Sequence, residues 1–292
     1  MPRVDIQRPN PVKRKTGGSV IDRISPIQFD EDEGIKMLVY GQSGSGKTTF
    51  WATFPGKILV AVCSGGNRTG ELRSVNTAEY RKKIDSVVVQ SIADMRDIVD
   101  HAADSSNGYK TLVLDHVSGL QDLALKEILG IDELPAQKSW GLASQQQYGQ
   151  CTMQCKEVLR AMLNLPINVV IIGQERTSRG DDESGGSYSE LLRPTVGVAT
   201  TPSLAGWLNP ACDYVVQTFK RPVMVRKTTK VGDKSVVTES RGKGVEYCLR
   251  CEPHDVYATK FRVPRGLPMP DVIIDPSYDK VIRVIRGESP TK

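Results

Sequence analysis

The residues with the clearest chemical capacity form one run, Gly41-Gln42-Ser43-Gly44-Ser45-Gly46-Lys47-Thr48, with Thr49 directly after it. The run matches the phosphate-loop pattern GxxxxGK[ST] at every fixed position, and the apolar residues 35–40 before it predict the strand that this pattern requires. Its glycines allow successive backbone N–H groups to point at phosphate oxygens, and a helix starting near Lys47 adds the positive end of its dipole. We therefore predict that residues 41–49 bind a nucleoside triphosphate.

Two side chains of this run have expected roles toward the phosphates. Lys47 is expected to reach the β- and γ-phosphates, and the Thr48 hydroxyl is expected to ligate Mg²⁺. The alternative is a Gly/Ser-rich linker that happens to end in Lys-Thr. The helical pattern of residues 49–54 after the run favours the phosphate loop over the linker.

A second candidate ligand is Asp115, which ends the apolar run Tyr109-Lys110-Thr111-Leu112-Val113-Leu114-Asp115. Parallel sheets place their ligand groups at the carboxyl ends of strands, and an Asp there is expected to hold Mg²⁺ through water. An Asp at the end of a strand is also common in ordinary loops. The assignment of Asp115 to the metal site therefore depends on its pairing with the phosphate loop.

Gln174 follows a further buried-type strand over residues 167–173. At the same sheet edge as the phosphate loop, its amide is able to sense a γ-phosphate by hydrogen bonding, although a plain loop residue would look the same. Residues 176–190 are polar and rich in Gly and Ser, so they predict a mobile loop on the nucleotide side.

The elements that must position these residues alternate between strands and helices. Apolar runs predict strands at 57–62, 86–90, 109–115, 167–173 and 213–219, and helical patterns cover 92–103, 117–130 and 142–163. This alternation indicates an α/β fold with a mostly parallel sheet and helices on both faces. Alternating runs at 223–226 and 245–250, with a turn at Gly232-Asp233, predict an antiparallel extension near the C-terminus.

The chain of 292 residues is 39% hydrophobic, which suffices for one large α/β domain or two small ones. No apolar run approaches the roughly 20 residues that cross a bilayer, and the N-terminus lacks the apolar core of a secretory signal. We expect a cytoplasmic protein without a membrane partner. Its six cysteines are expected to be reduced thiols.

Positive charge is concentrated in residues 220–265, where twelve Lys and Arg face five Asp and Glu. Such a basic β-ribbon region is expected to attract phosphates, although a solvated sheet face would have a similar composition. Residues 1–30 predict a flexible basic tail, either solvated or in contact with nucleic acid. The core is expected at 31–285, followed by a short tail at 286–292.

In this order, the parts resemble phage-encoded RecA-like P-loop ATPases of the single-strand annealing and recombination type. The resemblance spans about residues 35–285, and only the phosphate loop in it is highly specific. The residues that carry it are 41–48, 109–118, 140–149, 169–174 and 258–262. It implies a RecA-like fold and an ATPase that uses ATP and Mg²⁺ to act on single-stranded DNA. It also implies a homo-oligomeric ring or filament with ATP between subunits, and a single-strand-binding protein as a further partner.

The same resemblance implies two cations near the end of the core. RecA-like assemblies deliver a Lys-x-Arg pair into the neighbouring subunit's site, and Lys260 and Arg262 match that pair. In trans they would neutralise γ-phosphate charge in the transition state. The alternative is that both are ordinary surface charges. The loop after Gln174 takes the place of the family's DNA-contacting loop.

One departure from the family pattern affects hydrolysis. The family usually has a Glu before a Gly-Gly to orient the attacking water, and here Ser64 stands before Gly65-Gly66. Because proton abstraction contributes about two to four orders of magnitude in rate, we expect slow hydrolysis unless Glu71 or Glu175 substitutes. A nucleotide-gated DNA-binding or scaffold protein without ATPase activity is therefore an alternative. A GTPase or small-molecule kinase is a weaker one, because the chain lacks a guanine-reading Asn/Thr-Lys-x-Asp motif and a clear Arg-rich lid.

A zinc site is a further alternative at Cys248 and Cys251 with His254 nearby. Structural zinc requires four ligands, and the chain has no second CxxC. Cys151 and Cys155 lie one helical turn apart and would contribute only if the fold brought them close. We therefore favour buried structural thiols over a zinc site.

Overall fold

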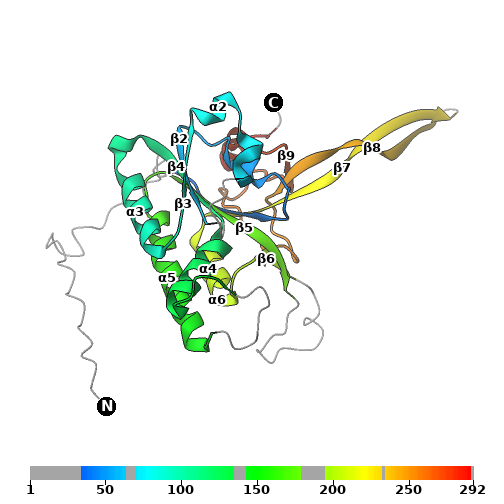
Figure 1. The fold of residues 1–292 in the computed structure, drawn as a ribbon. Coiled ribbons are helices and arrows are strands. Elements are labelled where there is room, and N and C mark those ends of the chain that lie inside the picture. The colour runs from blue at the N-terminus through cyan, green and yellow to red at the C-terminus, as the bar shows by residue number, and fades with distance from the viewer. Residues whose placement is uncertain (1–33, 64–69, 135–142, 179–194, 232–233, 291–292) are drawn as a thin grey trace, which may run out of the picture. The chain divides into compact units, whose positions relative to one another are not determined.

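A mixed sheet organises the chain, and its strands run in the order β3-β2-β4-β5-β1-β7-β8-β9 (Figure 1). The computed structural model describes residues 34–63, 70–134, 143–178, 195–231 and 234–290. The first six strands of this order are parallel, β8 is antiparallel to β7, and β9 is antiparallel to β8. The strands are β1 Lys36–Gly41, β2 Lys57–Val62, β3 Ile84–Val88, β4 Tyr109–Asp115, β5 Asn168–Ser178, β6 Thr195–Val198, β7 Tyr214–Val231, β8 Lys234–Arg250 and β9 Val272–Ile274.

Helices cover both faces of this sheet. The helices are α1 Lys47–Trp51, α2 Ala78–Arg81, α3 Ile92–Ala103, α4 Val117–Leu129, α5 Gln145–Leu163, α6 Pro202–Ala211 and α7 Tyr278–Ile285, with 3₁₀ turns at Gly70–Val75 and Ser105–Asn107. The predicted α/β fold, with its mostly parallel sheet and antiparallel C-terminal extension, is therefore confirmed. The segment Asp32–Lys292 forms one compact unit.

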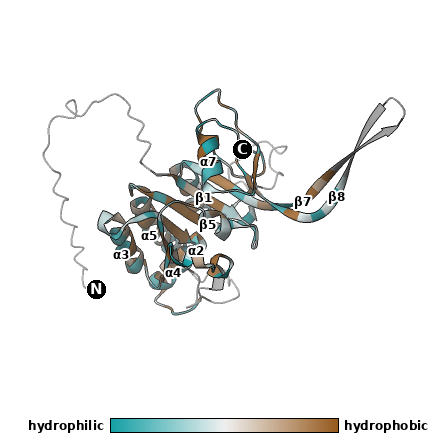
Figure 2. Ribbon diagram, turned by 90° about the horizontal axis from the view of Figure 1, so that it is seen from above, coloured by the Kyte–Doolittle hydropathy of each residue, from teal (hydrophilic) through white to brown (hydrophobic). Residues whose placement is uncertain are grey.

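The alternation of side chains along each strand separates two hydrophobic cores. On one face, Leu38 and Tyr40 of β1 belong to the core that α3, α4, α5 and α6 cover. On the other face, Met37 and Val39 belong to the core that α1 and α7 cover, which includes Trp51. Figure 2 shows the hydrophobic residues, in brown, gathered where the sheet meets its helices.

Local signals explain where two of the three longest helices, α3 and α5, start. At the N-terminus of α3, the Ser91 hydroxyl accepts a hydrogen bond from the backbone N–H of Asp94, and the Asp94 carboxylate accepts one from the N–H of Ser91. Ser144 and Gln147 form the same reciprocal cap at α5. Such caps satisfy N–H groups that the helix itself leaves unpaired. Helix α3 matches its predicted bounds, and α5 starts three residues later than residue 142.

Several predicted elements differ from the structure: β3 covers Ile84–Val88 rather than 86–90, and β7 continues to Val231 rather than ending at 219. The helix after the phosphate loop ends at Trp51 rather than Phe54. Strand β5 continues to Ser178 and pairs with β6, so the first residues of the predicted loop 176–190 are in a strand. The rest of that loop, the tail 1–30 and the turn Gly232-Asp233 lie outside the described residues.

Strands β7 and β8 continue past the sheet as a two-stranded ribbon (Figures 1 and 2). The strands have 18 and 17 residues and pair from Gln217↔Arg250 to Val231↔Lys234. A bulge between Pro222 and Met224 shifts their register, which lets a proline sit within a long strand. We use "the ribbon" below for residues 220–231 and 234–247.

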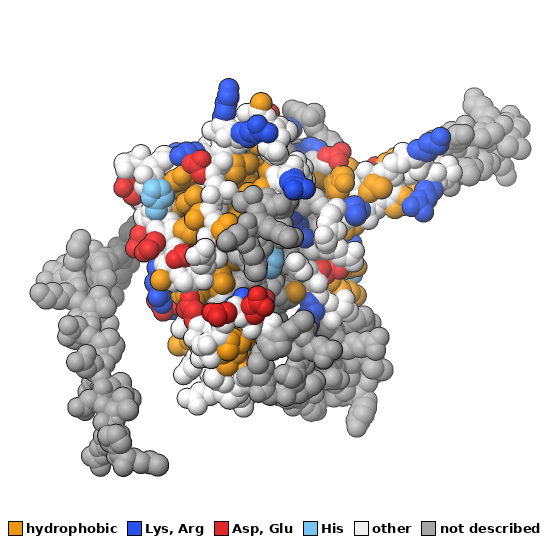
Figure 3. All heavy atoms as spheres, viewed as in Figure 1, with side chains coloured by type: hydrophobic (Ala, Val, Ile, Leu, Met, Phe, Trp, Pro, Cys, Tyr) orange, Lys and Arg blue, Asp and Glu red, His pale blue; other side chains and the backbone are white. Residues whose placement is uncertain are grey.

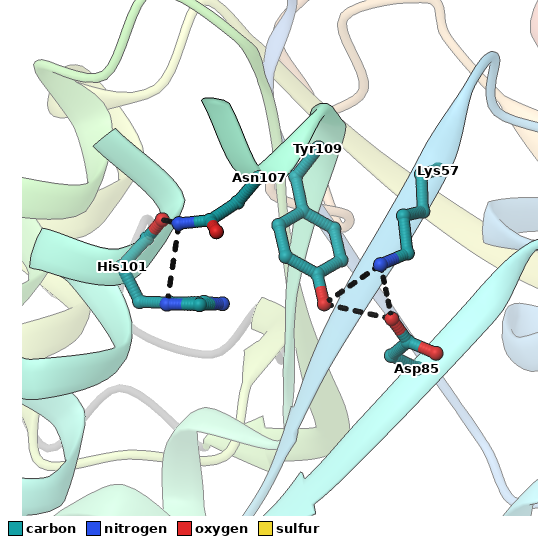
Figure 4. A network of polar contacts seen from close by, with 5 residues as sticks. All are labelled: Lys57, Asp85, His101, Asn107 and Tyr109. Carbon is teal, nitrogen blue, oxygen red and sulfur yellow. Dashed lines mark hydrogen bonds and ion pairs between the residues drawn. The ribbon is translucent and has the colours of Figure 1, made fainter. Parts of the chain in front are cut away.

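At the edge of the sheet where β2 and β4 begin, polar side chains connect three strands (Figure 4). The Lys57 ammonium lies 2.7 Å from an Asp85 carboxylate oxygen, and the Tyr109 hydroxyl donates to the same oxygen at 2.7 Å. Lys57 also lies 4.4 Å from the centre of the Tyr109 ring. This cluster is at the opposite end of the parallel strands from the phosphate loop, so we assign it to stability.

Among the described residues, no helix combines the length and the apolar character needed to cross a bilayer.

Candidate nucleotide-binding site

The phosphate loop connects the end of β1 to the start of α1. Gly41 is the last residue of β1, and Gly46 caps α1 with a φ of 93°, in the left-handed region. Gly44 has a φ of 71°. A Cβ placed on Gly41 would lie 2.3 Å from the carbonyl oxygen of Thr218, so only glycine fits there. The backbone conformation and the close packing therefore explain the glycines of the sequence pattern.

Lys47 bends back over the loop. Its ammonium donates to the carbonyl oxygens of Gly41, at 2.7 Å, and Gln42, at 2.9 Å. The loop is further fixed by the Thr49 hydroxyl, which donates to the carbonyl of Gly46 at 3.0 Å. The lysine charge is therefore positioned at the loop, as a phosphate site requires.

The predicted ligands lie around one cavity of about 770 Å³. Thr48 of α1, Asp115 of β4 and Gln174 of β5 all line it, together with Lys47. Asp115 is 5% exposed and Gln174 is exposed, and the peptide bond after Asp115 is cis. The parallel pairing of β1 with β5 and of β5 with β4 brings these residues to one edge. The structure thus brings together four of the predicted residues.

Residues from the C-terminal quarter of the chain complete the cavity wall. Tyr247 of β8 lines it, and so do Asp275, Pro276 and Ser277 before α7. A Cβ placed on Gly46 would lie 3.0 Å from Cδ1 of Tyr247, so this ring packs against the loop. None of these residues was predicted from the sequence. An alternating strand was predicted at residues 245–250, but nothing in it indicates contact with residues about 200 positions earlier.

Glu175 does not face the cavity. Along β5, Ile172 and Gln174 line the cavity, and successive side chains of a strand point to opposite faces. The Glu175 carboxylate instead accepts hydrogen bonds from Gln42, at 3.3 Å, and from the buried Gln217, at 2.8 Å. Gln217 in turn accepts from Arg250 at 3.1 Å. This geometry argues against Glu175 as the base that replaces the missing carboxylate.

A match to a family of known proteins agrees with this geometry. Residues 33–263 match a family described as AAA domain. The chain belongs to the AAA domain family. It is therefore an AAA-type P-loop ATPase domain. No curated protein matches the sequence.

Among solved structures, the chain is similar to a KaiC-like protein from the hyperthermophilic archaeon Pyrococcus horikoshii OT3. The two share 13% sequence identity with a TM-score of 0.41, and the match covers 84% of this chain and 90% of the other.

Lys260 and Arg262 of this AAA domain lie away from its own cavity. Lys260 forms a bridge with Val215, near the start of β7, and its ammonium donates to the carbonyl of Pro210 at 3.1 Å. Burial and the nearby Arg262 charge lower the pKa of Lys260. Arg262 forms an ion pair with Asp213 at 2.6 Å. Neither residue is therefore among those that line the cavity of its own chain.

The residue in the place of the hydrolytic Glu is Ser64, and the proposed substitutes were Glu71 and Glu175. Ser64 lies outside the described residues, and the side chain of Glu71 is likewise not described. His116, which lines the cavity, uses its Nδ1 to accept from the N–H of Gly119 at 3.0 Å. In the described part of the chain, the cavity wall thus holds one carboxylate from the strand edge, Asp115, and a second from the C-terminal region, Asp275.

The cysteines are all unpaired and buried. Across the described ranges, no three His, Cys, Asp or Glu side chains gather as a metal site. His254, the third residue of the predicted half-site, accepts from the N–H of Val256 at 3.0 Å and packs its ring on Tyr257. Burial raises the pKa of Cys251 to about 12, which disfavours the thiolate that zinc requires. These contacts favour structural thiols.

Proposed function

We propose that the chain binds ATP with Mg²⁺ in this cavity and acts on single-stranded DNA through the ribbon, as an annealing or strand-exchange protein of phage recombination or replication. One observation carries the nucleotide part of the proposal. The phosphate loop, Asp115 and Gln174 come from three different strands and line one cavity of about 770 Å³, which is the size of small-molecule sites.

The residues present suit a magnesium triphosphate. The positive φ angles of Gly44 and Gly46 form a backbone cradle that a Cβ on either residue would strain. The Thr48 hydroxyl and the Asp115 carboxylate supply the oxygen ligands that Mg²⁺ prefers. When bound, Mg²⁺ neutralises charge on the outer phosphates. Gln174 lies in the same wall, where its amide is able to hydrogen-bond the terminal phosphate.

The surface of the ribbon supports the single-stranded DNA part. Lys220, Arg241 and Lys243 are exposed on it, and so are Val245 and Tyr247. Figure 3 shows Lys and Arg side chains (blue) along the ribbon, with hydrophobic side chains (orange) between them. Single strands bind where cations follow the phosphates and apolar or aromatic side chains contact the bases. A charged, partly apolar ribbon offers both.

We further propose that hydrolysis is slow and that ATP is bound between subunits of a homo-oligomer. Glu175 faces away from the cavity, so it does not replace the water-orienting Glu whose position Ser64 occupies. The distance of Lys260 and Arg262 from their own cavity is consistent with delivery to a neighbour. A single-strand-binding protein would be a further partner on DNA.

The test measures nucleotide and DNA binding on the full-length protein. A fluorescent ATP analogue reports nucleotide binding. The anisotropy of a labelled oligo-dT reports DNA binding, and it is measured with ATP, with a slowly hydrolysed analogue and without nucleotide. Wild type should bind both, and Lys47→Ala should lose the nucleotide and the nucleotide-dependent part of DNA binding. Lys110→Ala, an exposed lysine at the far end of β4, is the matched control and should bind like wild type.

Three outcomes would overturn parts of the proposal. No affinity for any nucleoside triphosphate with Mg²⁺ would overturn all of it. Nucleotide binding without DNA binding in any state would overturn the DNA part. DNA binding that depends on nucleotide, with no phosphate released over hours, would favour the nucleotide-gated scaffold over the slow ATPase.

A further inference from the structure

Lys220 lies at the point where β7 leaves the sheet and enters the ribbon. It is exposed, and it pairs across the ladder with Tyr247 of β8. Paired residues in an antiparallel ladder place their side chains on the same face, so Lys220 and Tyr247 face the same way. Tyr247 is the residue whose ring packs against Gly46 and lines the nucleotide cavity.

On this face, Thr218 and Tyr247 contact the phosphate loop, and Lys220 lies beside it. The Thr218 hydroxyl lies 2.6 Å from the hydroxyl of Ser45. A Cβ placed on Gly44 would lie 3.6 Å from the Lys220 ammonium. With the Tyr247 contact at Gly46, the root of the ribbon thus lies along the loop over residues 44–46.

Within the described part of the chain, no carboxylate pairs with the Lys220 ammonium. Neither a hydrogen bond nor an ion pair joins it to any of the residues that the structure describes. The neighbouring Glu246 pairs with Arg221 at 2.8 Å, on the opposite face of the ladder. The Glu175 carboxylate accepts a hydrogen bond from Gln217, which also lies on the face opposite Lys220. The Lys220 ammonium therefore lies beside the phosphate loop near Gly44, and Lys47 is the cation that belongs to the loop itself.

We infer that Lys220 is a second phosphate-binding cation, supplied in cis by the ribbon to the outer phosphates of the bound nucleotide. The inference depends on the proposed nucleotide binding. Lys47 and Lys220 together place two positive charges at the loop. This arrangement suits the phosphates of a nucleotide, because each charge-assisted hydrogen bond to phosphate favours the bound state. Lys47, the loop's own cation, is expected at the β- and γ-phosphates, so a second cation beside the same loop would act on that end of the nucleotide.

Binding of ATP and ADP to Lys220→Gln tests this role. We expect about a tenfold loss of affinity for the triphosphate, or about 1.4 kcal/mol, and a smaller loss for the diphosphate. Lys220→Arg should retain most of the triphosphate affinity. Lys110→Gln removes the same charge at the far end of β4, away from the loop, and should bind both nucleotides like wild type. Thermal unfolding of each variant checks that the fold is unchanged.

The outcomes separate this inference from the proposed function. If wild type binds ATP and Lys47→Ala does not, but Lys220→Gln binds like wild type, the inference alone is wrong. Equal losses of ATP and ADP affinity, together with a lower melting temperature, would show that Lys220 supports the fold rather than the phosphates. If wild type binds no nucleotide, the proposed function itself fails.

Discussion

The hydroxyl oxygens of Ser45 and Thr218 lie 2.6 Å apart and join the phosphate loop to the strand that becomes the ribbon. Both side chains are buried, at 2% and 1% exposure. Thr218 also donates to the carbonyl oxygen of Tyr40 at 3.3 Å, so it accepts the bond from Ser45. The conformation of the loop therefore depends on a residue that lies 173 positions later in the chain.

Replacing Thr218 with Val should uncouple the loop from β7. The change keeps the shape of the side chain and leaves the buried Ser45 hydroxyl without its acceptor, which should cost about 1–3 kcal/mol of unfolding free energy. Nucleotide affinity should fall as well. Thr111→Val is the matched control, because Thr111 is equally buried and donates to Pro55, far from the loop. Urea unfolding should show similar losses for both variants. Unchanged nucleotide affinity in Thr218→Val would contradict the coupling.

Gly46→Ala should abolish nucleotide binding. The added methyl would meet the Tyr247 ring at 3.0 Å and hold a side chain at a φ of 93°. Gly130→Ala provides the control, since its φ is 65° but nothing lies within 4 Å of the added methyl. Both variants should lose roughly 1–2 kcal/mol of stability from backbone strain. Only Gly46→Ala should fail to bind a fluorescent ATP analogue, and retained binding would show that the loop tolerates the methyl.

Stability in acid should depend on Asp85. Hydrogen bonds from Lys57 and then Tyr109 hold the pKa of Asp85 below its ordinary value of 3.8. The folded state therefore binds the proton less readily than the unfolded state, and the contribution is complete above pH 3.8 and lost as the pH falls through the folded pKa. Asp85→Asn should be less stable than wild type at neutral pH, and the difference should shrink in acid.

Chemical unfolding at a series of pH values measures that difference. Asp100→Asn, which removes a charge from an exposed position on α3, is the control. Its difference from wild type should stay nearly constant across the same range. If the difference in unfolding free energy between wild type and Asp85→Asn does not change with pH, the ion pair contributes nothing measurable to stability. Many exposed ion pairs behave in this way.

Arg262 should act on a neighbouring subunit. Arg262→Ala and Lys47→Ala should each lower ATP turnover in the assembled protein, and a mixture of the two should regain part of it. In the mixture, some interfaces combine an intact phosphate loop with an intact Arg262. Asp213→Asn releases the ion pair without removing the arginine and should remain active. A mixture no more active than its parts, measured by phosphate release, would argue for ordinary surface charge.

The ribbon charges should set the salt dependence of DNA binding. Replacing Arg241 and Lys243 together with Gln should lower the slope of log affinity against log salt by about 1.4, at about 0.7 for each phosphate contact with a single strand. Lys110 and Lys126 of the core, replaced in the same way, should leave the slope unchanged. An oligo-dT titration at several salt concentrations measures it, and equal slopes in all proteins would place the DNA elsewhere.

The sequence predicted what local patterns determine. Asp115 was placed at the end of its strand because an apolar run stops there, and α3 was bounded correctly because its pattern is strongly periodic. Gln174 was placed at the cavity because it ends a buried-type strand, and the period-2 rule for strands would have turned Glu175 to the other face. That consequence was missed, so Glu175 remained a candidate base.

Residues that depend on pairing between distant strands were not predictable. Lys220 and Tyr247 reach the phosphate loop only because β7 pairs with β1 and β8 pairs with β7. The length of β7 was underestimated because Pro222 normally ends a strand, and the bulge that accommodates it has no clear signal in the sequence. The role proposed for Lys260 and Arg262 would likewise depend on a second subunit, whose position the sequence of one chain does not predict.

Strand β7 is one continuous piece from the centre of the sheet to the far end of the ribbon. From Thr218 to Val231 it covers about 43 Å at roughly 3.3 Å per residue. Over that length, a rotation of about 5° at Thr218 carries the outer end through roughly 4 Å. A small rotation of β7 beside the phosphate loop would therefore displace the outer end of the ribbon by a distance comparable to the spacing between neighbouring strands.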